Sequence, residues 1–324
     1  MPFKQFDRSR LILKPLTERT HDLNLSVMKH PGDQIEPLDK PAIEDIARSI
    51  LTASENDAAV ILMMGAHVIR SGNGPLIADL MSRKLITHVA MNGAGAIHDY
   101  EFALIGETCE SVARYVSSGE FGLWNETGRL NEYAAVAARN GHGFGETLGR
   151  IFEEEKLPNT ACSILAAGQR HQIPVTVHVS IGQDIIHQHP DFDGASTGSA
   201  SYADFLIFTE TLQKLEGGVL LNFGTAVMGP EVYLKALAMV RNVARQDGRT
   251  ITDFHTAVFD LLPLEGEDYH REAPRHEPGY YFRPWKTILV RTVADGGRST
   301  YIQGDHAQTF PTLFHHLGRL ESEC

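Results

Sequence analysis

Residues 58–95 read AAVILMMGAHVIRSGNGPLIADLMSRKLITHVAMNGAG, and this stretch decides the fold class. It begins with a continuous apolar run, 58–64, which is typical of a strand buried on both faces, as in parallel sheets. A glycine-rich loop follows, then residues 75–84, a helix with proline near its first turn. A second strand at 87–91 leads through NGAG into another helix. Two strand–loop–helix units in succession predict an α/β protein with a parallel sheet flanked by helices.

The same alternation continues along the chain. We expect further strands at 175–179, 219–223, 252–259 and 287–293, and helices at 42–53, 199–215 and 231–245. Residues 1–40 mix charge and proline and are expected to form an N-terminal arm or cap, with 41–324 as a single α/β domain. Residues 261–284 are irregular and long, which favours a functional loop or lid.

Composition excludes several classes of protein. The 324 residues carry 29 Lys and Arg against 41 Asp and Glu, a formal net charge of −12, so no broad cationic surface is available for nucleic acid. The longest apolar run, 58–65, is too short to span a bilayer, and the N-terminus has no apolar signal-peptide core. Three cysteines are too few and scattered for a disulfide framework. We therefore expect a cytoplasmic protein that contacts neither nucleic acid nor membrane.

Four loops qualify as ligand sites, because ligands of parallel sheets bind beyond the carboxyl ends of the strands. These are 65–67, 92–95, 224–226 and the loop that follows 254–257. The second is similar to a dinucleotide-binding fingerprint, except that His98 stands where the third glycine belongs. Ordinary turns that need glycine for their backbone geometry would explain the same residues.

Taken in order, these segments resemble those of deoxyhypusine synthase and its bacterial homospermidine-synthase-like relatives. The matching segments are 64–72 (MGAHVIRSG), 92–99 (NGAGAIHD), 224–227 (GTAV), 255–260 (HTAVFD) and 304–311 (GDHAQTFP). The resemblance implies a Rossmann-like fold that binds NAD at the interface of a homotetramer. The cofactor-binding residues that it implies are Gly65, Ala66, His67, Ser71, Asn92, Gly93, Ala94, Gly224, Thr225, Thr256, Ala257, Asp305 and His306.

The family holds its imine-forming lysine in a Trp-Gly-Lys triplet, and this chain has Trp285-Lys286. A lysine beside an aromatic wall can lose its hydration, which lowers its pKa and frees the amine for attack. Trp285 could also offer its face to a cationic amine. The alternative is a surface lysine that opens a strand at Thr287.

The histidine pair of the family's third loop is replaced here by Pro230-Glu231. The base of the reaction must therefore come from elsewhere, and His98, His67 and Glu231 are candidates. Asp99, Asp184 and Asp260 are candidates for binding the substrate, and the acidic excess favours a cationic one. The resemblance implies that NAD oxidises an amine or polyamine to an imine for aminoalkyl transfer. Because of the replaced residues, we do not expect the usual translation factor as acceptor.

A second hypothesis keeps the fold without the redox chemistry. His187 and His189 have the spacing that puts two imidazoles on one face of a strand, and they are weak candidates for binding Zn or Mn. The protein would then be a His/Asp metal hydrolase, or a nucleotide-binding regulatory protein without a metal. Histidines that are hydrogen-bonded at loop ends would explain the same residues.

Overall fold

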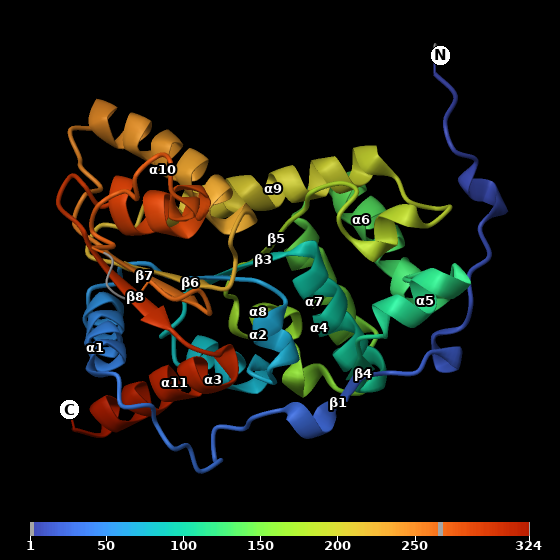
Figure 1. Ribbon diagram of the computed structural model, residues 1–324, viewed down its shortest axis with the longest axis horizontal. Coiled ribbons are helices and arrows are strands. Elements are labelled where there is room, and N and C mark those ends of the chain that lie inside the picture. Colours follow the sequence, from blue (N-terminus) through green and yellow to red (C-terminus); the bar gives the residue numbers. More distant parts are fainter. Residues whose placement is uncertain (1–2, 265–267, 324) are drawn as a thin grey trace.

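A computed structural model describes residues 3–264 and 268–323. Its centre is a six-stranded sheet in which every neighbouring pair of strands is parallel (Figure 1). The strands are β2 (Val60–Met64), β3 (His88–Asn92), β5 (Val175–His178), β6 (Val219–Phe223), β7 (His255–Asp260) and β8 (Arg298–Gln303). The prediction of an α/β fold, a Rossmann-like parallel sheet flanked by helices, is confirmed.

The sheet is built outward from its middle, in the order β5-β3-β2-β6-β7-β8. From β2 the chain moves through β3 to the edge strand β5, then returns to place β6 on the other side of β2. This is the order of dinucleotide-binding sheets, in which ligands bind where the direction reverses. In this protein the reversal lies between the carboxyl ends of β2 and β6.

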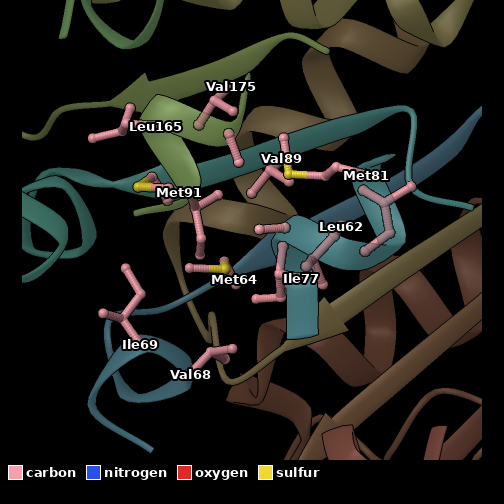
Figure 2. Close-up of a cluster of buried hydrophobic side chains, with 14 of the residues drawn as sticks. Leu62, Met64, Val68, Ile69, Ile77, Met81, Val89, Met91, Leu165 and Val175 are labelled. Carbon is pink, nitrogen blue, oxygen red and sulfur yellow. The ribbon is translucent and has the colours of Figure 1, made fainter. Parts of the chain in front are cut away.

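One face of the sheet is covered by helices whose apolar sides share one core, to which α6 (Asn125–Asn140) also contributes. They are α1 (Pro41–Glu55), α2 (His67–Arg70), α3 (Gly74–Ser82), α4 (Gly93–Ile105), α7 (Phe144–Glu154), α8 (Ile164–His171) and α11 (His306–Glu323). Figure 2 shows Leu62 and Met64 of β2 directed toward Ile77 of α3. Every residue of β2 and β6 is buried, because helices cover both faces.

The opposite face carries α9 (Gly194–Leu212), α10 (Met228–Gln246) and the π-helix η7 (Pro284–Arg291). Ile61 and Leu220 of the sheet share a second core there with Phe208 of α9 and Tyr233 of α10. Beside these layers lie η1 (Arg8–Arg10), η2 (Leu16–Glu18), β1 (Leu23–Asn24), η3 (Leu25–Val27), β4 (Glu107–Thr108), α5 (Val112–Ser118), α6 (Asn125–Asn140), η4 (Thr160–Cys162), η5 (Ile185–Gln188) and η6 (Pro278–Tyr281).

The strand expected at 287–293 is wrong, since these residues belong largely to η7. Short apolar runs fit a buried strand or a buried helix equally well. Here the run lies between the parallel strands β7 and β8, which need a crossover connection, and a helix supplies it. The strand itself comes later, at β8. Of the expected lid, residues 265–267 lie outside the described residues.

Residues 3–40 run along the outside of the helices, at the right and bottom of Figure 1. β1 pairs antiparallel with β4, and Leu16 packs with Tyr115 and Trp124. Arg19 forms a buried, bidentate ion pair with Glu101 of α4, in which Nη1 donates to Oε1 at 2.9 Å and Nη2 to Oε2 at 2.7 Å. The division into an arm, 1–40, and a domain, 41–324, stays a prediction. Among the described residues, no helix is long and apolar enough to cross a membrane.

Candidate functional site

The carboxyl ends of β2 and β6 meet at two glycines. The backbone N–H of Gly65 donates to the carbonyl of Phe223 at 3.0 Å, and a Cβ atom on Gly65 would stand 2.8 Å from the carbonyl oxygen of Gly224. Gly224 itself has a φ of +63° and lies against the ring of His306, leaving no room for a side chain. Both positions therefore need glycine, and the backbone there stays bare toward a ligand.

A cavity of about 230 Å³ opens at this point, and we call it the switch-point cleft. Its walls are Gly65, Asn92, Gly93, His178, Ser180, Gln183, Asp184, Gly224, Thr225, Ala226, Val227 and Met228. An adjoining cavity of about 430 Å³ shares His178, Ser180, Val227 and Met228 with it and extends to Glu231. Of the residues predicted to bind the cofactor, Gly65, Asn92, Gly93, Gly224 and Thr225 come together in the cleft.

Two helices begin at the cleft, and each is capped by a side chain from its wall. Asn92 Oδ1 accepts from the N–H of Gly95 at the start of α4, and Thr225 Oγ1 accepts from the N–H of Gly229 in α10, both at 2.9 Å. Helix N-termini carry partial positive charge and attract phosphate groups. This donor set fits a ligand with phosphates that approaches along bare backbone.

Asp184 occupies part of this positive region. Its carboxylate lies where a side chain on Gly93 would be, and it accepts from the backbone N–H of Ala94. Burial raises the pKa of Asp184 to about 6. Asp184 also forms a capping box with His187 at the start of η5. The expected acidic residue is therefore in the cleft wall, held in place from both sides.

His178 is a cleft residue that the sequence pattern does not single out as one. It ends strand β5, is 4% exposed, and lines both cavities. Its Nε2 lies 3.0 Å from Thr176 Oγ1, and its ring packs edge-on against Phe208. Burial lowers the pKa of His178 to about 4. Its position at the carboxyl end of a predicted strand is the signal that could have found it.

The loops after β2, β7 and β8 hold further predicted residues, which do not line the cleft. Ala66 precedes α2, exposed His67 begins it, and Ser71 follows it, its carbonyl accepting from Lys29. Partial loss of hydration, together with the charge of nearby Arg70, lowers the pKa of His67. Asp260 ends β7, and its Oδ1 accepts from the N–H of Leu262 at 3.1 Å.

The two residues predicted at the start of α11 differ in their surroundings. Asp305 is exposed and accepts from the N–H of Ala307 at 2.8 Å, while His306 is buried beneath Gly224. Among the described residues, Nδ1 of His306 is buried without a hydrogen-bond partner. His306 therefore supports the cleft from below, and Asp305 faces outward.

Three predicted positions on α4 do not line the cleft. Asp99 is buried and accepts from the Ser163 hydroxyl and from the N–H groups of Ile164 and Leu165, so it caps α8. Both carboxylate oxygens of Asp99 thus accept hydrogen bonds from within the protein, and the expected role of Asp99 in binding a substrate stays a prediction. His98 and Ala94 line another cavity of about 220 Å³, which shares Gln183 and Asp184 with the cleft. Burial there lowers the pKa of His98 to about 4.

Thr256 and Ala257 were expected at a cofactor loop, but they lie inside strand β7. They stand opposite Leu220 and Leu221 of β6, in the amino half of the sheet. The hydroxyl of Thr256 donates to the carbonyl of Ile288 in η7 at 3.0 Å. They are thus a structural contact between sheet and helix, short of the edge where ligands bind.

Lys286 is a buried lysine in the first half of η7, only 6% exposed, and it does not open a strand. Its Nζ lies 3.9 Å from the centre of the Tyr280 ring, a cation–π geometry, and no described carboxylate is paired with it. Trp285 points elsewhere: its Nε1 donates to the Arg271 carbonyl at 2.9 Å. Neither residue lines either of the two cavities at the edge of the sheet.

Glu231 lies between the larger cavity, which it lines, and Lys286. It lies in the first turn of α10, pairs with Lys235 and lies 3.3 Å from Arg283. The hydrogen bond from Lys235 lowers the pKa of Glu231, and the charges of Arg283 and Lys286 lower it further. Glu231 is therefore ionised and lies within electrostatic range of Lys286.

His187 and His189 do not converge. His187 Nδ1 accepts from two N–H groups of its own loop, whereas His189 is turned away, with Nε2 2.8 Å from the carbonyl of Gly122. In residues 3–264 and 268–323, no group of three or more His, Cys, Asp or Glu side chains is placed to hold a metal.

No protein-family model matches this sequence, and no curated protein is similar to it in sequence. Several solved structures share the fold. Unliganded AgrE superposes with a TM-score of 0.53 at 14% identity, over 86% of this chain and 33% of AgrE. The complex of AgrE with ornithine and NAD+ superposes with a TM-score of 0.52 at 14% identity, over 90% of this chain and 35% of AgrE. A protein from Methanococcus maripaludis S2, described as LOR/SDH, superposes with a TM-score of 0.50 at 17% identity, over 90% of this chain and 74% of that protein.

The fold and the site define a Rossmann-like α/β protein with its cleft at the topological switch point. The chain spans about a third of the length of AgrE, and at these identities the likeness establishes the fold alone. A protein from Entamoeba histolytica described as a deoxyhypusine synthase gives a TM-score of only 0.40 at 9% identity, too low to support that family. The resemblance in sequence motifs therefore stays a prediction.

Proposed function

We propose that this protein is an NAD-dependent enzyme that oxidises the carbon beside an amine nitrogen in a small amine or amino acid. The observation that carries the proposal is the approach of Gly65 and Gly224 at the switch point of the sheet. Dinucleotides bind at such points because bare backbone and helix N-termini can approach their pyrophosphate. AgrE, which shares the fold, forms a complex with ornithine and NAD+.

The residues of the cleft fit NAD, and each has its own proposed role in binding it. The pyrophosphate would lie against the bare backbone of Gly65 and Gly224 and at the N-terminus of α10, while Asn92 and Thr225 keep the helix starts in place. NAD, when bound, would supply the acceptor for a hydride. Asp184 and Glu231 bring negative charge to the two adjoining cavities, which favours a cationic amine in the larger one.

Transfer of an aminoalkyl group through an imine on Lys286 is the finer version of this proposal. Among the described residues no carboxylate is paired with the buried Nζ of Lys286, so no ion pair has to break before this amine attacks a carbonyl or imine carbon. A substrate would reach Lys286 from the larger cavity, on the side of Glu231. The homotetramer implied by the family resemblance belongs to the same proposal, and light scattering on the purified protein tests it.

Two measurements test the proposal in sequence. Isothermal titration with NAD should show binding that Gly224→Val abolishes, since a side chain there collides with His306. A panel of polyamines and basic amino acids should then produce reduced NAD, followed by its absorbance. If NAD does not bind, the redox proposal fails. If NAD binds and no amine is oxidised, the protein is a nucleotide-binding regulatory protein.

Borohydride trapping tests the step on Lys286. With NAD and an active amine, mass spectrometry should find a reduced adduct on Lys286 that Lys286→Met removes and Lys214→Met keeps. Lys214 is the matched control, because it lies exposed and paired with Asp57 at 2.7 Å. Amine oxidation without an adduct would show simple dehydrogenation in place of transfer.

A further inference from the structure

A chain of hydrogen bonds runs from the switch-point cleft into the core beneath it. It joins His178 and Thr176 of β5, His88 of β3 and Thr211 of α9. We propose that this chain holds His178 in the form protonated at Nε2, so that its bare Nδ1 is the general base for the substrate amine in the cleft. The inference rests on the proposed function for the base role, but the protonation of the ring can be tested without it.

The direction of each hydrogen bond follows from the innermost one. The hydroxyl of Thr211 donates to the carbonyl of Ile207 at 3.3 Å within α9, and a hydroxyl has one hydrogen to give. We assign that hydrogen to the Ile207 carbonyl, and in this assignment the hydroxyl accepts from Nδ1 of His88, 2.8 Å away. A neutral imidazole carries one N–H, so Nε2 of His88 accepts from Thr176 Oγ1 at 2.9 Å.

The same reasoning then fixes the outer histidine. Having given its hydrogen to His88, Thr176 Oγ1 can only accept from Nε2 of His178, at 3.0 Å. Nδ1 of His178 is left with a free electron pair. His178 lines both cavities, and Nδ1 makes no hydrogen bond to a described residue. The bare nitrogen is thus the one available to a ligand.

Both rings stay neutral, as this pattern requires. Burial lowers the pKa of His88 to about 3 and that of His178 to about 4. The chain ends at a buried carbonyl, and a charge on His88 would be costly, so it orients His178 and does not conduct protons. Thr176, His88 and Thr211 are positioning residues.

The titratable groups around His178 suit a proton that arrives with the substrate. His88 lies behind it, Asp184 and Glu231 line the cavities in front, and buried Asp204 of α9 binds the N–H of neighbouring Val177 at 2.8 Å. Nδ1 would accept the proton that the substrate nitrogen releases as its C–H bond breaks, and the carboxylates would stabilise the resulting imidazolium. In that step the nitrogen electron pair would form the C=N bond, and NAD, when bound, would accept the hydride from the broken C–H bond.

Nitrogen NMR of histidine-labelled protein without ligands tests the tautomer, with His178→Gln to assign the signals. The expected result is a neutral His178 with hydrogen on Nε2, and a neutral His88 with hydrogen on Nδ1. Thr176→Val should give a mixture of tautomers at His178, and Thr176→Ser should restore the single form. Hydrogen on Nδ1 of His178 in the wild type would overturn the proposal.

Kinetics tests the role as base. His178→Gln should lower kcat for amine oxidation by about 10²- to 10⁴-fold, the usual contribution of a general base, a much larger effect than its effect on NAD affinity. Thr176→Val should lower kcat less, and Thr176→Ser should recover it. If the wild type oxidises an amine and His178→Gln keeps its kcat, the base assignment fails and the proposed function stands. If the wild type binds NAD but oxidises no amine, both fail.

Discussion

The carbonyl oxygen of Gly224 faces Gly65 so closely that a Cβ atom on Gly65 would stand 2.8 Å from it. These two residues come from different halves of the chain, and their contact brings the ends of β2 and β6 together. The tightness of this contact is the reason that a ligand can approach the backbone there.

Gly65→Ala should therefore push the two strand ends apart. Overpacking of this kind costs about 1–3 kcal/mol, and urea unfolding would measure it. NAD binding, by titration, should weaken at the same time. Gly318→Ala is the matched control: Gly318 is exposed on α11 with nothing near it, and alanine favours a helix. If Gly65→Ala had the same unfolding free energy and NAD affinity as the wild type, the ends of the two strands would be able to move apart at no cost.

Arg19→Met should destabilise the protein strongly. Arg19 is the sole cation in contact with buried Glu101 among the described residues, and the substitution leaves that carboxylate uncompensated. Breaking such a pair costs about 3–5 kcal/mol, measurable by urea unfolding. Arg48→Met removes an exposed pair with Glu44 and should cost less than about 1 kcal/mol. Equal losses for both variants would contradict a structural role of the buried pair.

Asp204 makes the stability depend on pH. Burial raises the pKa of Asp204 to about 8, from 3.8 in the unfolded chain. The folded state therefore binds the extra proton, so its stability falls as the pH rises from about 4 to about 8. Asp204→Asn resembles the protonated acid and should remove this dependence, becoming more stable than the wild type at pH 8 by several kcal/mol.

Denaturant unfolding of wild type and Asp204→Asn at several pH values measures the difference. Asp193→Asn is the control, because Asp193 is exposed and its pKa is lowered by the hydrogen bond from Ser196. The difference in unfolding free energy between Asp193→Asn and the wild type should not change between pH 5 and pH 8. A flat difference for Asp204→Asn would mean that Asp204 folds ionised.

Cys109 and Cys162 should resist alkylation in the folded protein. Burial raises the pKa of both thiols, that of Cys162 to about 12, and only the thiolate reacts. Mass spectrometry after treatment with iodoacetamide at neutral pH should find both unmodified, and both modified in urea. Rapid modification of Cys162 without denaturant would show that the start of α8 opens readily.

The sequence pattern predicts the sheet better than its covering. The apolar runs at β2 and β6 are buried on both faces, and their composition alone is enough to predict them as strands. The run 287–293 carries the same signal, yet it forms η7, because its state depends on the crossover between β7 and β8. No local pattern contains that information.

The candidate site divides in the same way. Gly65 and Gly224 could be predicted, since strand-to-helix turns demand glycine locally. Which face of a strand or helix a polar residue occupies depends on distant partners, so Asp99 caps α8 and Thr256 binds η7. His178 enters the cleft because β5 pairs with β3, a relationship between segments far apart in sequence.

The order of strands also has a consequence during synthesis. β2 is made early, but β6, which covers its second edge, follows roughly 150 residues later. At about 5–20 residues per second, the ribosome needs roughly 8 to 30 seconds to supply it. Throughout that interval a wholly apolar strand offers unpaired backbone groups to any neighbouring chain. Production of this protein should therefore depend on chaperones that hold the nascent chain, whatever the stability of the finished fold.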